Sequence, residues 1–196
     1  DGKVAIVTGA ARGVAKGVAT AFVKEGAKVL IVDWEAETGA ATAAELAQFG
    51  EVAFMTVDLA DRAALPGIVA EAVSRFGKLD ILVHSAGATK RGDFLALTDD
   101  DWQDGYALKL FGAVRLARAA WPHIQAAQGA IINIGGVGGR IASAEFSIGG
   151  SVNAALMNFT KALADRGVEQ GVRVNLINPG NVRTDRLVAR AKLRAQ

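Results

Sequence analysis

A glycine-rich turn and an acidic residue near the amino end have the spacing of a dinucleotide site. The apolar run 3–8 leads into TGAARGVAKG, which places Gly9, Gly13 and Gly17 between an expected strand and an expected helix. Glycines here let backbone N–H groups approach a diphosphate, and the amino end of the helix adds partial positive charge. The next apolar run ends at Asp33, twenty residues after Gly13, where a carboxylate accepts hydrogen bonds from ribose hydroxyls. Strand, turn, helix, strand and acid together predict a dinucleotide site rather than merely a tight turn.

The same carboxylate bears on which dinucleotide binds. A 2′-phosphate on the adenosine ribose would bring a second negative charge against Asp33 with no cation between them. Arg12, in the turn, is the one nearby residue that could supply such a cation. The sequence therefore favours NAD over NADP, and Arg12 keeps NADP open.

Four short motifs carry a resemblance to a known family. They are TGAARG at 8–13, Asp58 after the third apolar run, HSAG at 84–87 and NPGNVRT at 178–184. Together they resemble the short-chain dehydrogenase/reductase family in its conventional layout. The resemblance implies that the first turn holds the diphosphate, the acid after the third strand holds the adenine, and the segment after the sixth strand contacts the nicotinamide. With Asp33 included, the predicted cofactor-binding residues are Gly9, Arg12, Gly13, Val14, Asp33, Asp58, Ser85, Ala86, Gly87, Pro179, Gly180, Val182 and Thr184.

The catalytic positions of the family are where this chain departs from it. Reduction of a carbonyl by hydride leaves an alkoxide, so the site must supply a proton and stabilise negative oxygen. The resemblance implies an Asn-Ser-Tyr-Lys tetrad for this task, in which the lysine lowers the pKa of the tyrosine. The matching positions here hold Lys109, Gly136, Gly149 and Asn153. We therefore expect a divergent member without the usual tetrad, and a pocket that the two glycines enlarge beside the nicotinamide.

Lys109 and Asn153 are the candidate catalytic residues. In the family the tetrad's asparagine and lysine face each other from neighbouring helices, and this chain has the same two residue types in exchanged places. Our hypothesis is that Lys109 supplies the positive charge of the site from the opposite wall. The alternative is that Lys109 extends along a helix surface near a subunit contact and that Asn153 caps a helix.

Other side chains are less suited to replace the missing acid. Tyr106, the only tyrosine, shares a helix face with Lys109, but in the family that face points away from the nicotinamide, so a packing role is expected. His84 titrates near neutral pH, yet it stands where the family has a structural side chain. The remaining candidates are hydroxyls and one loop carboxylate: Ser143, Ser147, Ser151 and Glu145.

Six short apolar runs must position these residues, at 3–8, 28–33, 52–58, 79–85, 129–135 and 172–178. Alanine-rich segments of helical spacing separate them, which predicts an α/β fold, a Rossmann-like doubly wound parallel sheet in three layers. We expect one dinucleotide-binding domain over residues 1–196, in which the family's closing strand is not found. The basic segment 183–196 is expected to be a solvated helix face, with a lid for an anionic substrate as the alternative.

Composition argues against several other classes of protein. The chain of 196 residues is 51% hydrophobic with only 3 prolines, which is typical of a compact α/β protein. It has no cysteine, so disulfides and thiolate metal sites are excluded and a reducing compartment such as the cytoplasm is expected. No metal is expected. A net charge of +2 argues against a nucleic-acid surface, and no apolar stretch approaches the roughly 20 residues of a membrane span.

Three functions remain open from the sequence. The preferred one is an NAD(P)-dependent oxidoreductase acting on a small alcohol or ketone through a non-standard active site. The alternatives are an NAD-binding protein without redox turnover, and a dehydratase or isomerase on the same scaffold. The apolar faces of helices expected at 101–125 and 147–166, which form the dimer contact in the family, predict a homodimer or homotetramer.

Overall fold

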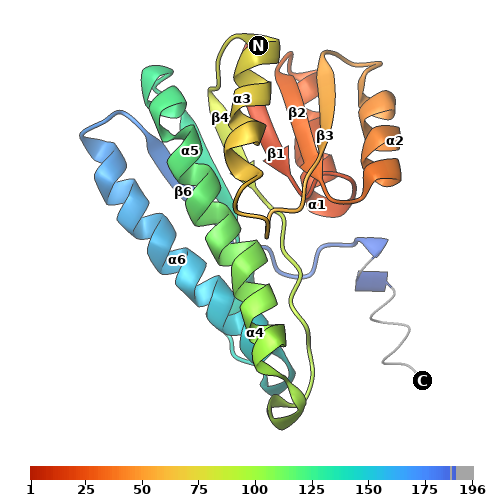
Figure 1. The fold of residues 1–196 in the computed structure, drawn as a ribbon, viewed down its shortest axis with the longest axis vertical. Helices are drawn as coiled ribbons and strands as arrows, with labels where there is room; N and C mark the ends of the chain where they lie inside the picture. The colour runs from red at the N-terminus through yellow and green to blue at the C-terminus, as the bar shows by residue number, and fades with distance from the viewer. Residues whose placement is uncertain (186, 189–196) are drawn as a thin grey trace.

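The computed structural model describes residues 1–185, 187 and 188, and the rest of the basic segment lies outside the described residues. One parallel sheet has the strand order β3-β2-β1-β4-β5-β6 (Figure 1). Its strands are β1 (Val4–Thr8), β2 (Lys28–Asp33), β3 (Val52–Thr56), β4 (Ile81–His84), β5 (Ala130–Ile134) and β6 (Arg173–Ile177). Each lies within its predicted apolar run, so the α/β class and the Rossmann-like parallel sheet are confirmed.

The strand order reverses direction between β1 and β4. Val7 of β1 pairs with Ile31 of β2 on one side and with Val83 of β4 on the other. Crossovers to the two sides leave in opposite directions here, which opens a crevice at the carboxyl ends of the strands. Thr8 and His84 end β1 and β4 at this edge.

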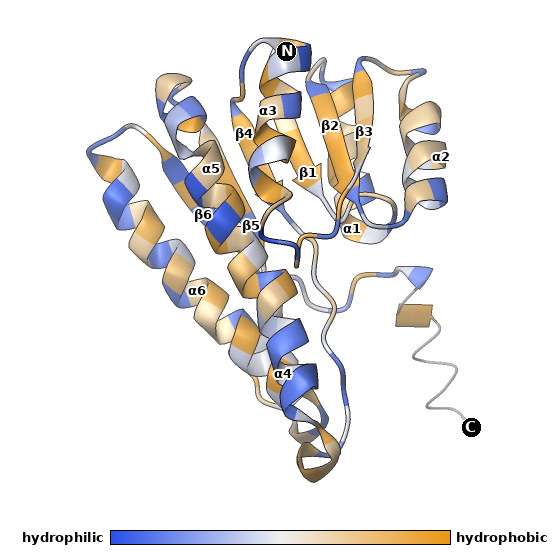
Figure 2. Cartoon of the chain, in the orientation of Figure 1, coloured by the Kyte–Doolittle hydropathy of each residue, from blue (hydrophilic) through white to orange (hydrophobic). Residues whose placement is uncertain are grey.

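Helices cover both faces of the sheet. Helices α1 (Gly13–Lys24) and α2 (Ala36–Leu46) pack on one face, and α3 (Leu65–Phe76), α5 (Gly112–Ala126) and α6 (Ser147–Val168) pack on the other. Successive residues of β1 alternate between two apolar clusters, with Val4 and Ile6 in one and Ala5 and Val7 in the other. The buried strands therefore read as continuous apolar segments, and Figure 2 shows them in orange between helices of mixed hydropathy. The predicted three layers are confirmed.

The helix predicted over 101–125 is interrupted by a wider turn. Helix α4 (Asp99–Tyr106) begins at a capping box in which Thr98 and Asp101 exchange hydrogen bonds. The π-helical segment η2 (Ala107–Phe111) follows and leads directly into α5. Such segments change the direction in which side chains leave a helix and recur at functional sites. Lys109 lies at the centre of this one.

Shorter 3-10 turns are η1 (Phe94–Ala96), η3 (Val137–Gly139) and η4 (Ala144–Phe146), and residues of η3 and η4 line the crevice. Within the described part of the chain, no helix has the length and apolar character needed to cross a bilayer. Those same residues include no cluster of His, Cys, Asp or Glu side chains able to hold a metal ion.

Candidate active site

A crevice of about 930 Å³ opens at the carboxyl ends of the strands. Every residue that the sequence analysis proposed for cofactor binding lines it, and so do Lys109 and Asn153. These residues come from the end of β2, from the loops after β1, β3, β4 and β6, and from α1, η2 and α6. The fold therefore brings together positions that span the chain from Gly9 to Thr184.

The first turn has the shape of a phosphate cradle. Gly9 and Gly13 adopt φ angles of +70° and +65°, which glycine accommodates most readily. A Cβ atom at Gly9 would lie 2.8 Å from Cα of Ala86, so only glycine lets the turn pass this close to the loop after β4. Arg12 is the N-cap residue of α1, and its side chain makes no capping hydrogen bond. The N–H groups of the first helical turn are thus left without that cap at the crevice wall.

A rigid carboxylate lies at the end of β2. The two carboxylate oxygens of Asp33 accept hydrogen bonds from the backbone N–H groups of Ala11 (2.9 Å) and Glu35 (3.2 Å). Arg12 forms an ion pair with Glu35. This part of the crevice therefore contains the Asp33 carboxylate, fixed by two backbone hydrogen bonds, and Arg12, which is paired with the carboxylate of Glu35.

A buried hydrogen-bond network joins β1, β4 and the π segment. His84 Nε2 lies 3.1 Å from the carbonyl oxygen of Lys109, and its Nδ1 lies 3.4 Å from Oγ1 of Thr8. Because a carbonyl only accepts, Nε2 carries the proton and the Thr8 hydroxyl donates to Nδ1. Thr8 Oγ1 also accepts from the N–H groups of Ser85 and Ala86.

This environment keeps His84 neutral near pH 7. Burial lowers its pKa from 6.5 to about 4; the carbonyl of Lys109 acts to raise it, and the charge of Lys109 acts to lower it further. With both ring nitrogens engaged inside the protein, His84 has a structural role, as its position at a strand end suggested.

Lys109 points into the crevice. Its Nζ donates a hydrogen bond of 3.3 Å to the carbonyl oxygen of Gly135. Its stem passes so close to Gly87 that a Cβ atom there would lie 2.8 Å from Cδ of Lys109. The alternative of a lysine extended along the outer helix surface is therefore wrong.

Asn153 approaches the same loop from α6. It lies in the second turn of the helix and is 2% exposed, so the helix-cap alternative is wrong as well. Its Nδ2 lies 3.1 Å from the point where a Cβ atom of residue 136 would stand, whereas its buried Oδ1 has no hydrogen-bond partner among the described residues. Lys109 and Asn153 thus reach the Gly135–Gly136 dipeptide from two different helices.

The expected enlargement of the pocket at Gly149 is wrong. A Cβ atom at Gly149 would overlap the ring of Phe146, and Phe146 rather than Gly149 lines the crevice. The guanidinium of Arg91 lies over that ring, 4.0 Å from its centroid. Phe146 is the N-cap residue of α6 and stands three positions before Gly149, a spacing that residue type alone did not single out.

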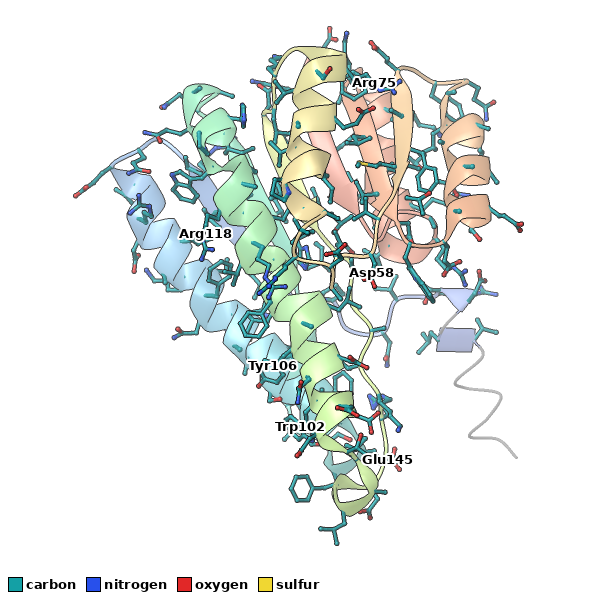
Figure 3. The ribbon with its side chains drawn as sticks, in the orientation of Figure 1. Asp58, Arg75, Trp102, Tyr106, Arg118 and Glu145 are labelled. Atoms are coloured by element: carbon teal, nitrogen blue, oxygen red, sulfur yellow. The ribbon has the colours of Figure 1, made fainter. Side chains whose placement is uncertain are left out.

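Of the other candidate proton donors, only Ser143 lines the crevice. Tyr106 stacks on Trp102 with ring centroids 6.5 Å apart, both on α4 (Figure 3), and is not among the crevice residues, so the packing role fits. Ser151 donates to the carbonyl of Ile148 within α6. Ser143 lines the crevice, while the buried hydroxyl of Ser147 has no partner among the described residues. Sequence reasoning also missed Trp34, Arg91, Asp104 and Phe146, which line the crevice but belong to none of the family motifs.

Comparison with known proteins agrees with this geometry. A family model described as short chain dehydrogenase matches residues 3–194. The chain is 37% identical to L-fucose dehydrogenase of Oryctolagus cuniculus, over 93% of this chain and 64% of that protein. It is 32% identical to meso-2,3-butanediol dehydrogenase of Serratia marcescens, over 94% and 73% of the two chains.

A solved structure shows the same likeness. L-sorbose reductase from Gluconobacter frateurii, complexed with NADPH and L-sorbose, superposes with a TM-score of 0.95 at 33% identity and covers 100% of this chain and 75% of its own. The chain thus spans about two thirds to three quarters of the length of these relatives. Sheet order, crevice and sequence agree, and the chain belongs to the short-chain dehydrogenase family.

Proposed function

We propose that the protein is a nicotinamide-dependent oxidoreductase that interconverts a small alcohol and its ketone through a non-standard active site. In this site Lys109, Gly136, Gly149 and Asn153 stand in place of the family's usual tetrad. The observation that carries the proposal is the convergence of the Lys109 ammonium and the Asn153 amide on Gly135–Gly136, inside the crevice.

The residues of the crevice fit a nicotinamide dinucleotide. The turn at Gly9 has no room for a side chain, and the amino end of α1 has no cap from Arg12, as a diphosphate site requires. Asp33 and Asp58 would hold the adenosine end, and Pro179, Gly180, Val182 and Thr184 the nicotinamide end. When bound, the cofactor supplies or accepts the hydride.

NAD is proposed in preference to NADP. A 2′-phosphate would meet the carboxylate of Asp33 and would have to draw Arg12 away from Glu35. The L-sorbose reductase relative is complexed with NADPH, so the comparisons do not favour NAD. The proposal therefore depends on the ion pair and on Asp33.

Lys109 would act on the oxygen of the substrate. One of its three N–H donors is directed to Gly135, and the ammonium can direct another at a carbonyl oxygen that gains negative charge. In the reduction direction Lys109 donates its proton to that oxygen, the product leaves as the alcohol, and solvent in the open crevice returns the proton to Lys109. In oxidation the same proton moves the other way.

Asn153 would provide a second hydrogen bond to the substrate oxygen. Its Nδ2 occupies the space beside Gly136 where the family's serine side chain would project. A serine Cβ at 3.1 Å would crowd this amide, so glycine at 136 and asparagine at 153 are compatible with each other.

A second candidate is an NAD-binding protein without redox turnover. Phe146 favours this candidate, because its ring fills the space next to Gly149 where the proton-donating hydroxyl of the family's tyrosine would be expected. The third possibility, a dehydratase or isomerase, has no support from the relatives compared above, each of which is a dehydrogenase or a reductase.

The test begins with titration of NADH and NADPH into the protein, followed by fluorescence, and then assays a panel of small alcohols and ketones with the cofactor that binds. Lys109→Met should keep cofactor affinity and lower kcat by about 10²- to 10³-fold, because the oxyanion loses its charged donor. Lys161→Met, on an exposed turn of α6, is the matched control. Unchanged turnover in Lys109→Met contradicts the catalytic role, and tight NADH binding by wild type without any turnover favours the second candidate.

We propose one dinucleotide-binding domain over residues 1–196 and a homodimer or homotetramer formed through α5 and α6. The exposed side chains of Phe111 and Val168 lie at the ends of these helices and support such a contact. A cytoplasmic location rests on the cysteine-free composition alone.

A further inference from the structure

We infer that the indole of Trp34 is a stacking platform for the adenine base of the nicotinamide cofactor. The inference rests on the proposed function for the class of cofactor alone. It adds a flat aromatic contact to the polar contacts proposed for Asp33 and Asp58. Trp34 lies in the short connection between the end of β2 and the start of α2, and it lines the crevice.

The side chain of Trp34 is 73% exposed, the largest exposed fraction of any aromatic residue in the chain. The other two tryptophans have partners inside the protein, since Trp102 stacks on Tyr106 and Trp121 donates a hydrogen bond of 2.6 Å to Gln170. Among the described residues, Trp34 has no ring contact and belongs to neither apolar cluster. An indole in this position loses water from its face when a flat ligand enters the crevice.

The backbone around Trp34 is fixed, although its side chain is exposed. Oδ1 of Asp33 accepts a hydrogen bond of 3.2 Å from the N–H of Glu35, which closes an Asx turn with Trp34 at its centre. Oδ2 of Asp33 accepts from the N–H of Ala11, so the turn is also tied to the loop after β1. Glu35 is the N-cap residue of α2. The indole therefore projects from a connection held at both ends, which limits the entropy lost on binding.

A turn after β3 borders the same end of the crevice. The N–H of Val57 donates a hydrogen bond of 3.0 Å to the carbonyl oxygen of Asp33, so the loop after β3 begins beside the connection that carries Trp34. In that loop the Asp58 carboxylate accepts from the backbone N–H two residues later at 2.9 Å, which forms a second Asx turn. Residues 58–60 line the crevice together with Trp34. A planar group bound at this end can therefore contact both the indole and the turn.

The chemistry of a nucleotide places the base near Trp34. Asp33 is proposed to accept hydrogen bonds from the ribose hydroxyls, and the base is attached to the neighbouring carbon of the same sugar. The base therefore lies next to the carboxylate, within reach of the following residue. Every nucleobase has a flat π face, and stacking on an aromatic side chain strengthens binding by about five-fold or more. Because the 2′-phosphate of NADP is on the sugar, the indole would contribute equally to the binding of both dinucleotides.

Trp34 also provides the readout for a test. The chain has three tryptophans, and of these Trp34 alone lines the crevice. In a double variant with Trp102→Phe and Trp121→Phe, Trp34 is the single emitting indole, and its fluorescence is followed while AMP, ADP-ribose or nicotinamide mononucleotide is added. In the wild-type background, calorimetry measures the affinities of Trp34→Ala, Trp34→Phe and the control Phe94→Ala. Phe94 is 61% exposed and is not among the crevice residues. Circular dichroism establishes that each variant is folded.

We expect AMP and ADP-ribose to quench the emission of Trp34, and nicotinamide mononucleotide, which has no adenine, to leave it unchanged. Trp34→Ala should bind ADP-ribose at least about five-fold more weakly, because the stacking surface is lost. Trp34→Phe should recover most of this loss, and Phe94→Ala should equal wild type. The affinities of Trp34→Ala for NADH and NADPH should fall by the same factor, so that their ratio stays that of wild type.

Equal affinity of wild type and Trp34→Ala for ADP-ribose overturns the inference, even when alcohols or ketones are turned over. Absence of ADP-ribose binding by wild type overturns it as well. A changed oligomeric state of Trp34→Ala in size-exclusion chromatography, without a loss of affinity, would make Trp34 a protein contact and has the same meaning. Quenching by AMP together with weaker binding by Trp34→Ala, in a protein without any turnover, supports the platform while the redox proposal fails.

Discussion

The end of the crevice where we propose that the adenosine of the cofactor binds contains an arginine and two carboxylates. Asp33 is held by two backbone N–H groups, and Arg12 is paired with Glu35 two residues further along. The positive charge of Arg12 is therefore already compensated, although its place in the turn would suit a 2′-phosphate. The ion pair is partly exposed to solvent, so its contribution to the preference for NADH over NADPH is small.

Glu35→Gln should raise the affinity for NADPH relative to NADH by up to about five-fold, because Arg12 becomes available to a 2′-phosphate. Fluorescence titration of both cofactors measures the ratio. Glu45→Gln removes the exposed carboxylate that pairs with Lys16 and serves as the control. An unchanged ratio in Glu35→Gln would show that Arg12 plays no part in the discrimination.

At the scale of elements, the π segment η2 determines what Lys109 can do. The backbone carbonyl of Lys109 accepts a hydrogen bond from His84, and its ammonium donates one to the carbonyl of Gly135. Lys109 therefore connects β4, the crevice and the loop after β5. A regular helix would bond that carbonyl to an N–H four residues later. A π segment bonds it to one five residues later instead, and the Lys109 carbonyl also accepts from His84.

The start of α6 is shaped by Phe146 packing on Gly149. Gly149→Ala should lower the free energy of unfolding by about 1–3 kcal/mol, because the added methyl group overlaps the ring. Phe146→Leu combined with Gly149→Ala should recover much of this loss. Urea unfolding followed by circular dichroism measures both effects.

Gly17→Ala provides the comparison, since a Cβ atom there has no neighbour within 4 Å and the residue lies inside α1. It should be neutral or slightly stabilising. Wild-type stability in Gly149→Ala would mean that Phe146 moves aside freely. A tyrosine at position 149 would then be accommodated without a second change.

At the scale of the whole molecule, two buried titratable groups connect β1 to β4 at opposite ends of the sheet. His84 reaches Thr8 at the carboxyl ends. Asp80, at the other end, accepts from Lys3 Nζ and from the N–H of Val4, both at 2.9 Å. Burial acts to raise the pKa of Asp80, but the hydrogen bonds from Val4, Lys3 and Lys78 outweigh it and the pKa is lowered. Both groups link the stability of the sheet to pH.

Acid should weaken the protein in two stages. The pKa of His84 is about 4 when folded and near 6.5 when unfolded, so the unfolded chain binds the proton first as pH falls below 6.5. This should remove about 2 kcal/mol between pH 7.5 and pH 5. The contribution of Asp80 is present above its ordinary pKa of 3.8 and is lost as pH falls below that value.

Urea unfolding at pH 7.5 and pH 5 checks the first stage. His84→Asn, which keeps a polar side chain at this position but removes the titrating group, should reduce the difference between the two pH values by about 2 kcal/mol. His123→Asn, at an exposed histidine on α5, should leave that difference unchanged. An identical pH dependence in His84→Asn and wild type would show that His84 is not the group responsible.

Local sequence was sufficient to predict the strands of the sheet and the glycine-rich turn that follows the first of them. The central strands β1 and β2 are nearly continuous apolar runs because helices bury both faces of the sheet there, and that pattern is visible without coordinates. The interval from Gly13 to Asp33 is likewise set by one strand, one turn and one helix. These features depend on neighbours in the chain, so spacing alone predicted them.

Tertiary structure alone determined the surroundings of Lys109 and Gly149. The direction of Lys109 depends on a π turn and on the loop after β5, neither of which leaves a periodic signal in the sequence. The space beside Gly149 could be judged only from the position of Phe146, which fills it, and Arg91 and Lys109 line one pocket because the fold brings the loop after β4 to η2. Packing and charge in that pocket arise between segments far apart in the chain, which is why residue type and spacing could name its members but not their contacts.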